Sequence, residues 1–594
     1  MSLVVQKFGG TSVADSSKIL AAARKAVRAH QQGHQVVMVV SAMGKNTDTL
    51  ISLANEINEK PPAREMDMLL STGEQVSVAL MAMAIDSLGA KAVSLTGSQI
   101  GIKTDSSHTK ARIHSISTER MQALLDDGNI VIAAGFQGID DNYNITTLGR
   151  GGSDTTAVAL AAVLGADQCE IYTDVDGIYT TDPRKLPEAC LVPRVCYDEM
   201  LELASLGAGV MHSRSIEFGK KFNVPIHVRS SLSDNPGSLI VDDADTSGMV
   251  VSGAALTRDE AMISIQSVPD VPGTILKIFS PIADRKITVD MIVQNVSDDG
   301  TTSISFTLPR EEVEDAVAVI KPLIETLGGQ LAPVNENVSK VSAVGLGMAH
   351  EGGVAKRMFR ALADAGINLD IITTSEIKIS VLVSRESAVD SLRTIHSEFE
   401  LDKIESDPNA NREVKTSSSP VSPVDVIQRL QEIGMESLII DDISMDDTQA
   451  RITICKIPNR PGLAAKLFED IAANDLFVDM IVQSHGSDKI ADITLTVPRD
   501  QLSRALEVTE RASKEYGCEK VVHKASIAKL SVSGIGMRSH TGVAIGSFEA
   551  LAEAGINVEM ISTSEVRVNI VVDGAEGAAG LACLQKRFSE AMSN

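Results

Sequence analysis

The second half of this 594-residue chain contains one long internal repeat. Short strings recur at a fixed distance, so that Pro461 matches Pro272 and Asp479 matches Asp290. Each matching pair lies 189 positions apart (461 minus 272, and 479 minus 290), and Thr374 and Thr563 keep the same spacing. A constant offset through separate motifs indicates that a whole block was duplicated without net insertion.

Each copy of the block consists of two halves with the same pattern. A strand leads through a Gly-containing turn into a helix, expected at residues 274–283 and 354–365 of the first copy. A further strand, a hairpin, a second helix and a last strand would complete a β-α-β-β-α-β unit. The sequence therefore predicts four α+β, ferredoxin-like units, at residues 246–335, 336–405, 436–523 and 524–594, with a solvated linker at 406–435.

The first part of the chain alternates strand and helix signals. Residues 36–40 form a continuous aliphatic run, as expected for a strand buried on both faces. Further strands are expected at residues 92–95, 130–134, 170–173 and 225–229. This alternation predicts an α/β layered domain that ends near residues 237–241.

The composition limits the partners and the compartment. The formal net charge is −25, and so acidic a surface repels nucleic acid and anionic membranes. No apolar run approaches the roughly 20 residues that span a bilayer, and no leader pattern opens the chain. The six cysteines have no C-x-x-C spacing, so reduced, mostly structural thiols are expected. A cytoplasmic enzyme that binds neither nucleic acid nor membrane is the expectation.

The first candidate site is a Gly-rich turn between a strand and a helix, Lys7-Phe8-Gly9-Gly10-Thr11-Ser12. Two glycines let the backbone approach a ligand, the helix N-terminus supplies N–H donors, and Lys7 adds a full charge. Such a turn can cradle a phosphate, although a purely structural turn has the same composition. It is not G-x-x-x-x-G-K-[ST], so a Walker-type NTPase is disfavoured.

Two further loops follow other expected strands. Gly149-Arg150-Gly151-Gly152-Ser153-Asp154 opens a helix of nearly pure Ala, Val and Leu. Arg150 offers a planar fork for a carboxylate, whereas Ser153 or Asp154 could be a plain helix N-cap. The polar loop from Thr173 to Arg184 could hold an adenosine group or simply be solvated.

Taken together, these motifs resemble the aspartokinase family. The other strings that match, in family order, are Ser41-Ala42-Met43-Gly44, Gly73-Glu74 and Thr173-Asp174-Val175-Asp176-Gly177. The resemblance implies the amino-acid kinase fold, an open, mainly parallel sheet between helical layers, over residues 1–245. It also implies phosphorylation of the side-chain carboxylate of L-aspartate by MgATP, the first step towards lysine, threonine, methionine and isoleucine.

The resemblance implies roles for individual residues. Lys7 would neutralise the transferring phosphoryl group and Asp154 would organise that lysine, so these two are the expected catalytic residues. Arg150 would hold the substrate α-carboxylate, and Glu74 would face its α-ammonium group. The remaining expected substrate-binding residues are Ser41, Thr47, Gly151, Gly152 and Ser153. The expected nucleotide-binding residues are Lys7, Phe8, Gly9, Gly10, Ser41, Thr173, Asp174, Tyr179, Asp182 and Arg184. Mg²⁺ would arrive with ATP, so no metal site formed by the protein alone is expected.

One position departs from the family pattern. Many members carry a lysine where this chain has Gly209, and that lysine is thought to touch the nucleotide phosphates. Either Arg184 or Lys220 compensates, or the affinity for ATP is lower.

The repeated units resemble ACT domains, which pair sheet to sheet and bind amino acids at their interfaces. The resemblance implies lysine and/or threonine as allosteric ligands and a homodimer formed through the ACT units. The ligand loop and facing strand of the first block would contain Asp270, Gly273, Thr274, Asp290 and Gln294, and the paired unit Val354, Asn368, Ser375 and Glu376. The second-block counterparts are Asn459, Asp479, Gln483, Val543, Asn557, Ser564 and Glu565. Because Asp270 becomes Asn459, the first block is expected to be the better site and the second to be altered or partly structural.

Several alternatives stand beside this interpretation. Another amino-acid kinase, acting on glutamate or acetylglutamate, would share the same loops. The residues assigned to the ACT sites could instead only cap helices and fill turns. A pure sensor with a degenerate kinase domain would have lost Lys7 or Asp154, and both are present. A fusion with homoserine dehydrogenase is excluded, because no G-x-G-x-x-G follows a strand after the first domain and the repeats occupy the C-terminal length.

Overall fold

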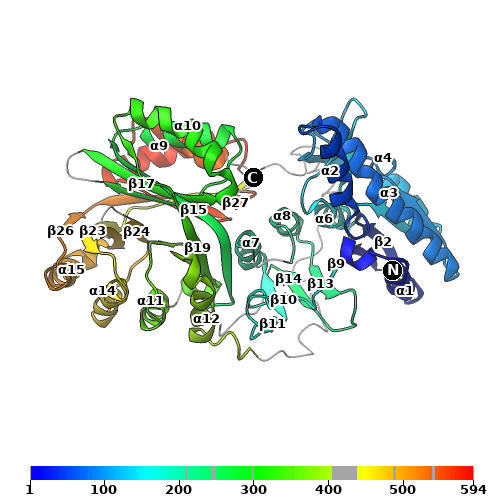
Figure 1. The fold of residues 1–594 in the computed structure, drawn as a ribbon, viewed down its shortest axis with the longest axis horizontal. Helices are drawn as coiled ribbons and strands as arrows, with labels where there is room; N and C mark the ends of the chain where they lie inside the picture. Colours follow the sequence, from blue (N-terminus) through cyan, green and yellow to red (C-terminus); the bar gives the residue numbers. More distant parts are fainter. Residues whose placement is uncertain are drawn as a thin grey trace.

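The computed structural model describes residues 2–207, 210–242, 249–296, 300–349, 351, 353–404, 438–485, 490–537 and 542–592. They form an N-terminal lobe and a C-terminal lobe (Figure 1). The predicted linker at 406–435 and Gly209 lie outside the described residues.

The N-terminal lobe is built on an eight-stranded sheet with the order β12-β14-β13-β9-β1-β2-β6-β3. Every neighbouring pair is parallel except β13 and β14. This confirms the predicted open, mainly parallel sheet. The strands are β1 (Leu3–Phe8), β2 (Gln35–Val40), β3 (Ala92–Leu95), β6 (Ile130–Ala134), β9 (Gln168–Thr173), β12 (Arg194–Cys196), β13 (Ile226–Ser230) and β14 (Ser238–Val241).

Helices cover both faces of this sheet. On one face lies α6 (Gly152–Leu164), whose thirteen residues are all buried, as its Ala, Val and Leu composition requires. On the other face lie α1 (Ser16–Gln31) and α3 (Ala63–Ser87). A small second sheet beside them has the order β5-β4-β7-β8. Its strands are β4 (Ile102–Thr104), β5 (Ile113–Ile116), β7 (Gln137–Ile139) and β8 (Ile145–Thr147).

Helix α3 is the one helix in the described part of the chain that is long and apolar enough to cross a membrane, judged by length and composition alone. This corrects the expectation that no apolar run approaches that length. One face of it packs into the core through Val78, Met81 and Ile85. It also buries the carboxyl groups of Asp67 and Glu74. The other face of α3 is exposed and carries Val76, Leu80 and Met83.

The C-terminal lobe contains four α+β units, but they are interleaved rather than consecutive. Units 1 and 3 have the predicted β-α-β-β-α-β order, whereas units 2 and 4, within the described residues, lack the predicted last strand and take a strand from the start of their block instead. Strand β15 (Gly253–Pro269) pairs with β19 (Asn335–Val344) through residues 253–257 and with β17 (Thr301–Pro309) through its later residues. The second block repeats this: β22 (Ile439–Asp446) pairs with β27 (Ile527–Ile535), whereas β23 (Gln449–Pro458) pairs with β25 (Ile490–Pro498).

Each block therefore begins with a strand that completes the sheet of its second unit. The sequence division at 335/336 and at 523/524 is corrected in this respect, because residues 253–257 and β22 belong with the second unit of their blocks. Unit 1 also contains α9 (Thr274–Asp284), β16 (Asp290–Val296), α10 (Val313–Thr326) and β18 (Gln330–Leu331). Unit 2 contains α11 (Val354–Asp364), β20 (Ile371–Thr374), β21 (Lys378–Ser384) and α12 (Ala388–Glu398). Unit 3 contains α14 (Leu463–Ala473), β24 (Ile481–His485), α15 (Leu502–Tyr516) and β26 (Lys520–Lys524). Unit 4 contains α16 (Gly542–Glu553), β28 (Met560–Thr563), β29 (Arg567–Asp573) and α17 (Gly577–Arg587).

The units pair across the two blocks. Unit 2 joins unit 3 through antiparallel β20 and β24, and unit 1 lies beside unit 4, where Gln294 Nε2 donates to the Val558 carbonyl at 2.8 Å. The two paired sheets stack on an apolar layer that includes Met262, Leu382 and Met480. Figure 1 shows α11, α12, α14 and α15 in a row on one outer side and α9 and α10 on the opposite side. Among the described residues, β20 and β24 thus pair as strands within one chain, and β16 contacts β28.

Candidate functional site

A cavity of about 860 Å³ opens where the parallel strands β1 and β2 end. Ligands of open α/β sheets bind at this edge, outside the carboxyl ends of the strands. The cavity brings together all of the predicted catalytic and substrate-binding residues, with Gly9 and Gly10 of the predicted nucleotide-binding set. Those that line it are Lys7, Gly9, Gly10, Ser41, Thr47, Glu74, Arg150, Gly151, Gly152, Ser153 and Asp154.

An ion pair lies in the wall of this cavity. Lys7 Nζ at the end of β1 is 2.5 Å from Asp154 Oδ1 in the first turn of α6, and the two side chains are 11% and 12% exposed. Gly10 next to it has no room for a side chain, because a Cβ there would lie 2.8 Å from the Ala42 carbonyl oxygen. The backbone of this turn can therefore approach a ligand closely.

The start of α6 forms the opposite wall. Its N-cap is Gly151 in the left-handed region at φ 70°, where a Cβ would lie 2.3 Å from the side chain of His212. Ser153 and Asp154 fall inside the first turn and make no cap, so the alternative that either is a plain N-cap is wrong. The first turn of a helix carries unpaired N–H groups and the positive end of the helix dipole, which suits an anion.

Glu74 is the carboxylate that is expected to face the α-ammonium group of the substrate. It is buried on α3 at 4% exposure, and its Oε1 accepts from the Ala42 N–H at 3.1 Å. Its Oε2 has no hydrogen-bond partner among the described residues. Burial raises the pKa of Glu74 from 4.5 to about 7, because the charged form is poorly solvated there. A cationic ligand group would satisfy this oxygen.

The other residues that were predicted to bind the nucleotide lie outside the cavity lining. Phe8 is buried in the core and stacks on Tyr172, with ring centroids 4.6 Å apart. Thr173, Asp174, Tyr179, Asp182 and Arg184 do not line the cavity, although Thr173 is close to it, since Gly9 N donates to the carbonyl of the preceding Tyr172 at 3.3 Å.

Both proposed substitutes for a lysine at position 209 are engaged elsewhere. The Arg184 side chain is 82% exposed and bonds Asp182 at 3.0 Å. Lys220 bonds Asp198 at 2.7 Å.

Several further lining residues were given no individual role from the sequence, although Ala42, Gly44 and Gly149 lie in motifs singled out there. They are Ala42, Gly44, Ile51, Leu70, Thr109, Lys110, Phe136, Thr147, Leu148, Gly149, His212 and Arg214. Thr109 and Lys110 lie in the loop between β4 and β5, which carries no recognisable motif. His212 and Arg214 begin α8 (Ser213–Phe222) and reach the cavity only because α8 packs against α6.

Two matching cavities lie at the unit interfaces of the C-terminal lobe. One, of about 90 Å³, is lined by Asp290 of unit 1, Ser564 and Glu565 of unit 4, and Lys378 of unit 2. The other, of about 150 Å³, is lined by Val354, Ser375, Glu376 and Asp479 of units 2 and 3. Their lining residues correspond through the 189-residue offset, as Asp290 and Asp479 do. Each cavity combines the first unit of one block with the second unit of the other.

The predicted ligand loops also face residues of the other block. Asp270 Oδ1 accepts from Asn557 Nδ2 at 2.9 Å, and Asn459 Oδ1 accepts from Asn368 Nδ2 at 3.2 Å. The Gln483 side chain donates to the Leu369 carbonyl at 2.7 Å, as Gln294 does at the other interface. The interpretation that each block forms its own site is therefore corrected.

Three other residues predicted for the ACT sites help to form the turn before α9 or the core of unit 4. Gly273 is left-handed at φ 88° and precedes Thr274, the first residue of α9, whose hydroxyl donates to the Pro269 carbonyl at 2.8 Å. Val543 is buried in the core of unit 4 and lines neither of the two matching cavities.

Glu74→Gln is expected to stabilise the N-terminal lobe at alkaline pH. The unfolded carboxyl ionises near pH 4.5 and the folded one near pH 7, so stability falls as the pH rises between these values and the full cost is present above pH 7. A difference of about 2.5 pKa units corresponds to at most about 3 kcal/mol. Urea unfolding should show the variant to be more stable than the parent at pH 8 and nearly equal at pH 4.5. The exposed Glu65→Gln on the same helix serves as the control, and no gain at pH 8 would contradict the burial argument.

Family models match the N-terminal lobe and three of the four units of the C-terminal lobe. The amino acid kinase family matches residues 2–230, and ACT domain models match residues 261–327, 341–399 and 530–588. Among solved structures, aspartate kinase from Synechocystis is 38% identical with a TM-score of 0.52, covering 100% of this chain and 99% of that one. The E. coli aspartokinase III complex with lysine and aspartate is 25% identical with a TM-score of 0.54, covering 67% of this chain and 99% of that one.

Curated relatives agree with the structural neighbours. The chain is 50% identical to an aspartokinase of Pseudomonas aeruginosa over 405 residues, which is 68% of this chain and 98% of the relative. It is 47% identical to an aspartokinase of Corynebacterium efficiens over 407 residues, 68% of this chain and 97% of that relative. The matched length accounts for the N-terminal lobe and about one block of the repeat. On this evidence the chain belongs to the aspartokinase family.

Proposed function

We propose that the chain transfers the terminal phosphoryl group of ATP to the side-chain carboxylate of L-aspartate, giving ADP and 4-phospho-L-aspartate. This would be the first step of lysine, threonine, methionine and isoleucine biosynthesis, in the cytoplasm. The observation that carries the proposal is the charge arrangement of the 860 Å³ cavity. Lys7 would neutralise the phosphoryl group, Glu74 would take the α-ammonium group, and Arg150 would hold the α-carboxylate.

The other predicted residues support this assignment. Gly10 would donate its backbone N–H to the phosphates. The Gly9 N–H already bonds the Tyr172 carbonyl at 3.3 Å, so Gly9 would contribute close approach of the backbone rather than this donor. Asp154 would orient Lys7, and Ser41, Thr47, Gly151, Gly152 and Ser153 would surround the acceptor. Because a carboxylate is already a nucleophile at pH 7, the protein supplies alignment and charge stabilisation rather than a base.

The nucleotide would extend from Gly9 towards the loop after β9, where Thr173, Asp174, Tyr179, Asp182 and Arg184 lie. Mg²⁺ enters with ATP and offsets the charge of its phosphates. No group of three or more His, Cys, Asp or Glu side chains in the described part of the chain is arranged to hold a metal by itself.

Lys7→Ala is expected to lower kcat with aspartate by roughly 10³-fold, since it removes the cation at the transferring group. The exposed Lys103→Ala is the matched control and should keep normal turnover. Coupled assays with aspartate, glutamate and acetylglutamate separate the proposed substrate from its alternatives. Unchanged turnover of the Lys7 variant, or preference for glutamate, would overturn the proposal.

We further propose that lysine and/or threonine bind at the ACT interfaces and inhibit the kinase. Direct contacts between the lobes support such coupling. Lys378 of unit 2 pairs at 2.9 Å with Glu202, which lies on α7 (Tyr197–Ser205) of the N-terminal lobe. Glu202 also accepts from the Glu565 N–H of unit 4 at 2.8 Å. Although burial opposes its charge, Glu202 and Asp290 raise the pKa of Lys378 above its usual value.

The double variant Glu202→Gln with Lys378→Met removes both charges of this ion pair. The concentration of amino acid needed for half-inhibition is expected to rise about 10-fold, within the usual range of allosteric coupling. The pair Arg357 and Glu398, which lies within unit 2, offers the control double variant Arg357→Gln with Glu398→Gln. Equal shifts in both double variants would argue against this route.

The Asp270 and Asn459 loops are expected to differ as ligand sites. Asp270 offers a carboxylate to an ammonium group at the interface of units 1 and 4, whereas Asn459 offers a neutral amide at the interface of units 2 and 3. Calorimetry with lysine and with threonine should show a loss of about 10-fold or more for Asp270→Ala, and a smaller loss for Asn459→Ala. Equal losses would refute the difference between the two loops.

The predicted homodimer stays a proposal. The edges β20 and β24, which would join ACT units of two chains, are already paired with each other. We therefore propose that a dimer of this chain uses other surfaces as well.

A further inference from the structure

Two charged side chains outside the predicted set hold the loops around the substrate side of the cavity. The first loop, here loop A, is residues 105–111, and the second, loop B, is residues 147–153. Thr109 and Lys110 of loop A line the cavity, as do residues 147–153 of loop B. One backbone hydrogen bond joins the loops directly, from Ala111 N to Thr147 O at 2.9 Å.

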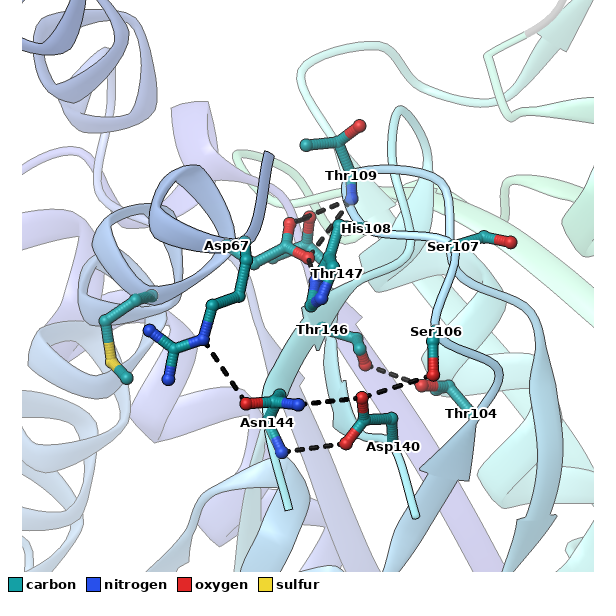
Figure 2. Close-up of polar contacts among 12 residues, drawn as sticks. Asp67, Thr104, Ser106, Ser107, His108, Thr109, Asp140, Asn144, Thr146 and Thr147 are labelled. Carbon is teal, nitrogen blue, oxygen red and sulfur yellow. Dashed lines mark hydrogen bonds and ion pairs between the residues drawn. The ribbon is translucent and has the colours of Figure 1, made fainter. Parts of the chain in front are cut away.

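The carboxylate of Asp67 accepts hydrogen bonds from both loops. Its carboxylate is fully buried on α3 and accepts from the Thr109 N–H of loop A at 3.0 and 3.1 Å. Its two oxygens also contact His108 Nδ1 at 2.7 Å and the Thr147 hydroxyl of loop B at 2.5 Å. Figure 2 shows Asp67 reaching from its helix to these three residues. One carboxylate therefore ties together α3, loop A and loop B.

Arg214, on α8, joins the same two loops through its guanidinium group. Its guanidinium donates to the Ala111 carbonyl of loop A at 2.7 Å and to the Leu148 carbonyl of loop B at 2.6 Å. An anion on α3 and a cation on α8 thus bridge the same pair of segments. Charged groups make the stronger hydrogen bonds, so each bridge resists separation of the loops.

The backbone of loop A is strained at the point that Asp67 holds. Thr109 has φ +67°, which is rare for a β-branched residue and strains the backbone there. This conformation brings the Thr109 carbonyl oxygen 3.0 Å from where a Cβ of Gly149 would stand. Loop A therefore packs directly on the backbone that precedes Arg150. Strain of this kind persists only where surrounding contacts enforce it.

We propose that Asp67 and Arg214 are positioning residues for the acceptor amino acid. By fixing loop A against loop B, they set where Arg150 and the first turn of α6 meet the substrate. This inference rests on the proposed function, because it assigns the acceptor to loop B and the nucleotide to the glycine turn after β1. Neither residue contacts that turn in any described hydrogen bond. Loss of either should therefore weaken the acceptor far more than ATP.

The test compares Asp67→Asn and Arg214→Gln with the parent enzyme. Each variant is expected to raise the KM for aspartate by about 10-fold or more, with the KM for ATP changed less than about 3-fold. Arg214→Lys should be intermediate, because one ammonium group cannot reproduce the fork that spans two carbonyls. A purely structural role predicts equal changes in both KM values, or a loss of thermal stability alone, and either result would overturn the proposal.

Two further variants sharpen the test. Asp140→Asn removes the other carboxylate of Figure 2, which binds Asn144 and Ser106 and does not line the cavity, so it should leave both KM values unchanged. Adding Thr109→Gly to Asp67→Asn should recover part of the lost aspartate affinity, because glycine adopts positive φ without strain. Absence of any recovery would contradict the role assigned to Asp67.

Hydrogen exchange separates this inference from the proposed function. Asp67→Asn and Arg214→Gln should each speed amide exchange in both loops, whatever the substrate is. If the parent enzyme does not phosphorylate aspartate but both loops lose protection in the two variants, the proposed function is wrong and the positioning role of Asp67 and Arg214 is retained. If protection in the variants is unchanged, the positioning role itself is refuted.

Discussion

The ion pair of Lys7 and Asp154 fixes the geometry on which the rest of the cavity depends. Lys7 ends the central strand β1, and Asp154 lies in the first turn of α6, the most completely buried helix of the lobe. A partly buried pair of this kind adds little net stability, because desolvation offsets most of the attraction. Its effect is positional, since it joins the sheet edge to a helix that cannot move without disrupting the core. The glycine turn and loop B are then placed on either side of one cation.

Much of the architecture could be predicted because it depends on patterns of nearby residues in the sequence. The constant offset revealed the duplicated block, and aliphatic runs located the buried strands of the sheet. The interleaving could not be predicted in the same way. Alternation of side chains shows which face of a strand is buried but does not identify its neighbour. Residues 253–257 have the same pattern whether they pair with β17 or with β19, and only tertiary packing decides.

The same division holds for the candidate site. Glycine-rich motifs at strand ends pointed to Lys7, Arg150 and Asp154, the resemblance to the aspartokinase family implied Glu74, and the fold gathers all four in one cavity. Asp67 was missed because a carboxylate near the start of a helix is usually exposed, where it complements the helix dipole. It is buried here only because loop A folds over it. The positive φ of Thr109 likewise has no signature in a residue that normally avoids it.

The pairing of units across the two blocks has a consequence for assembly. Both halves of each ACT interface belong to one polypeptide, so their association is intramolecular and is governed by an effective local concentration set by the connecting chain. If the same halves were carried by separate subunits, the interface would dissociate on dilution. The response to an inhibitor would then depend on the protein concentration. Here the paired units are made with every molecule, in fixed one-to-one proportion with the N-terminal lobe.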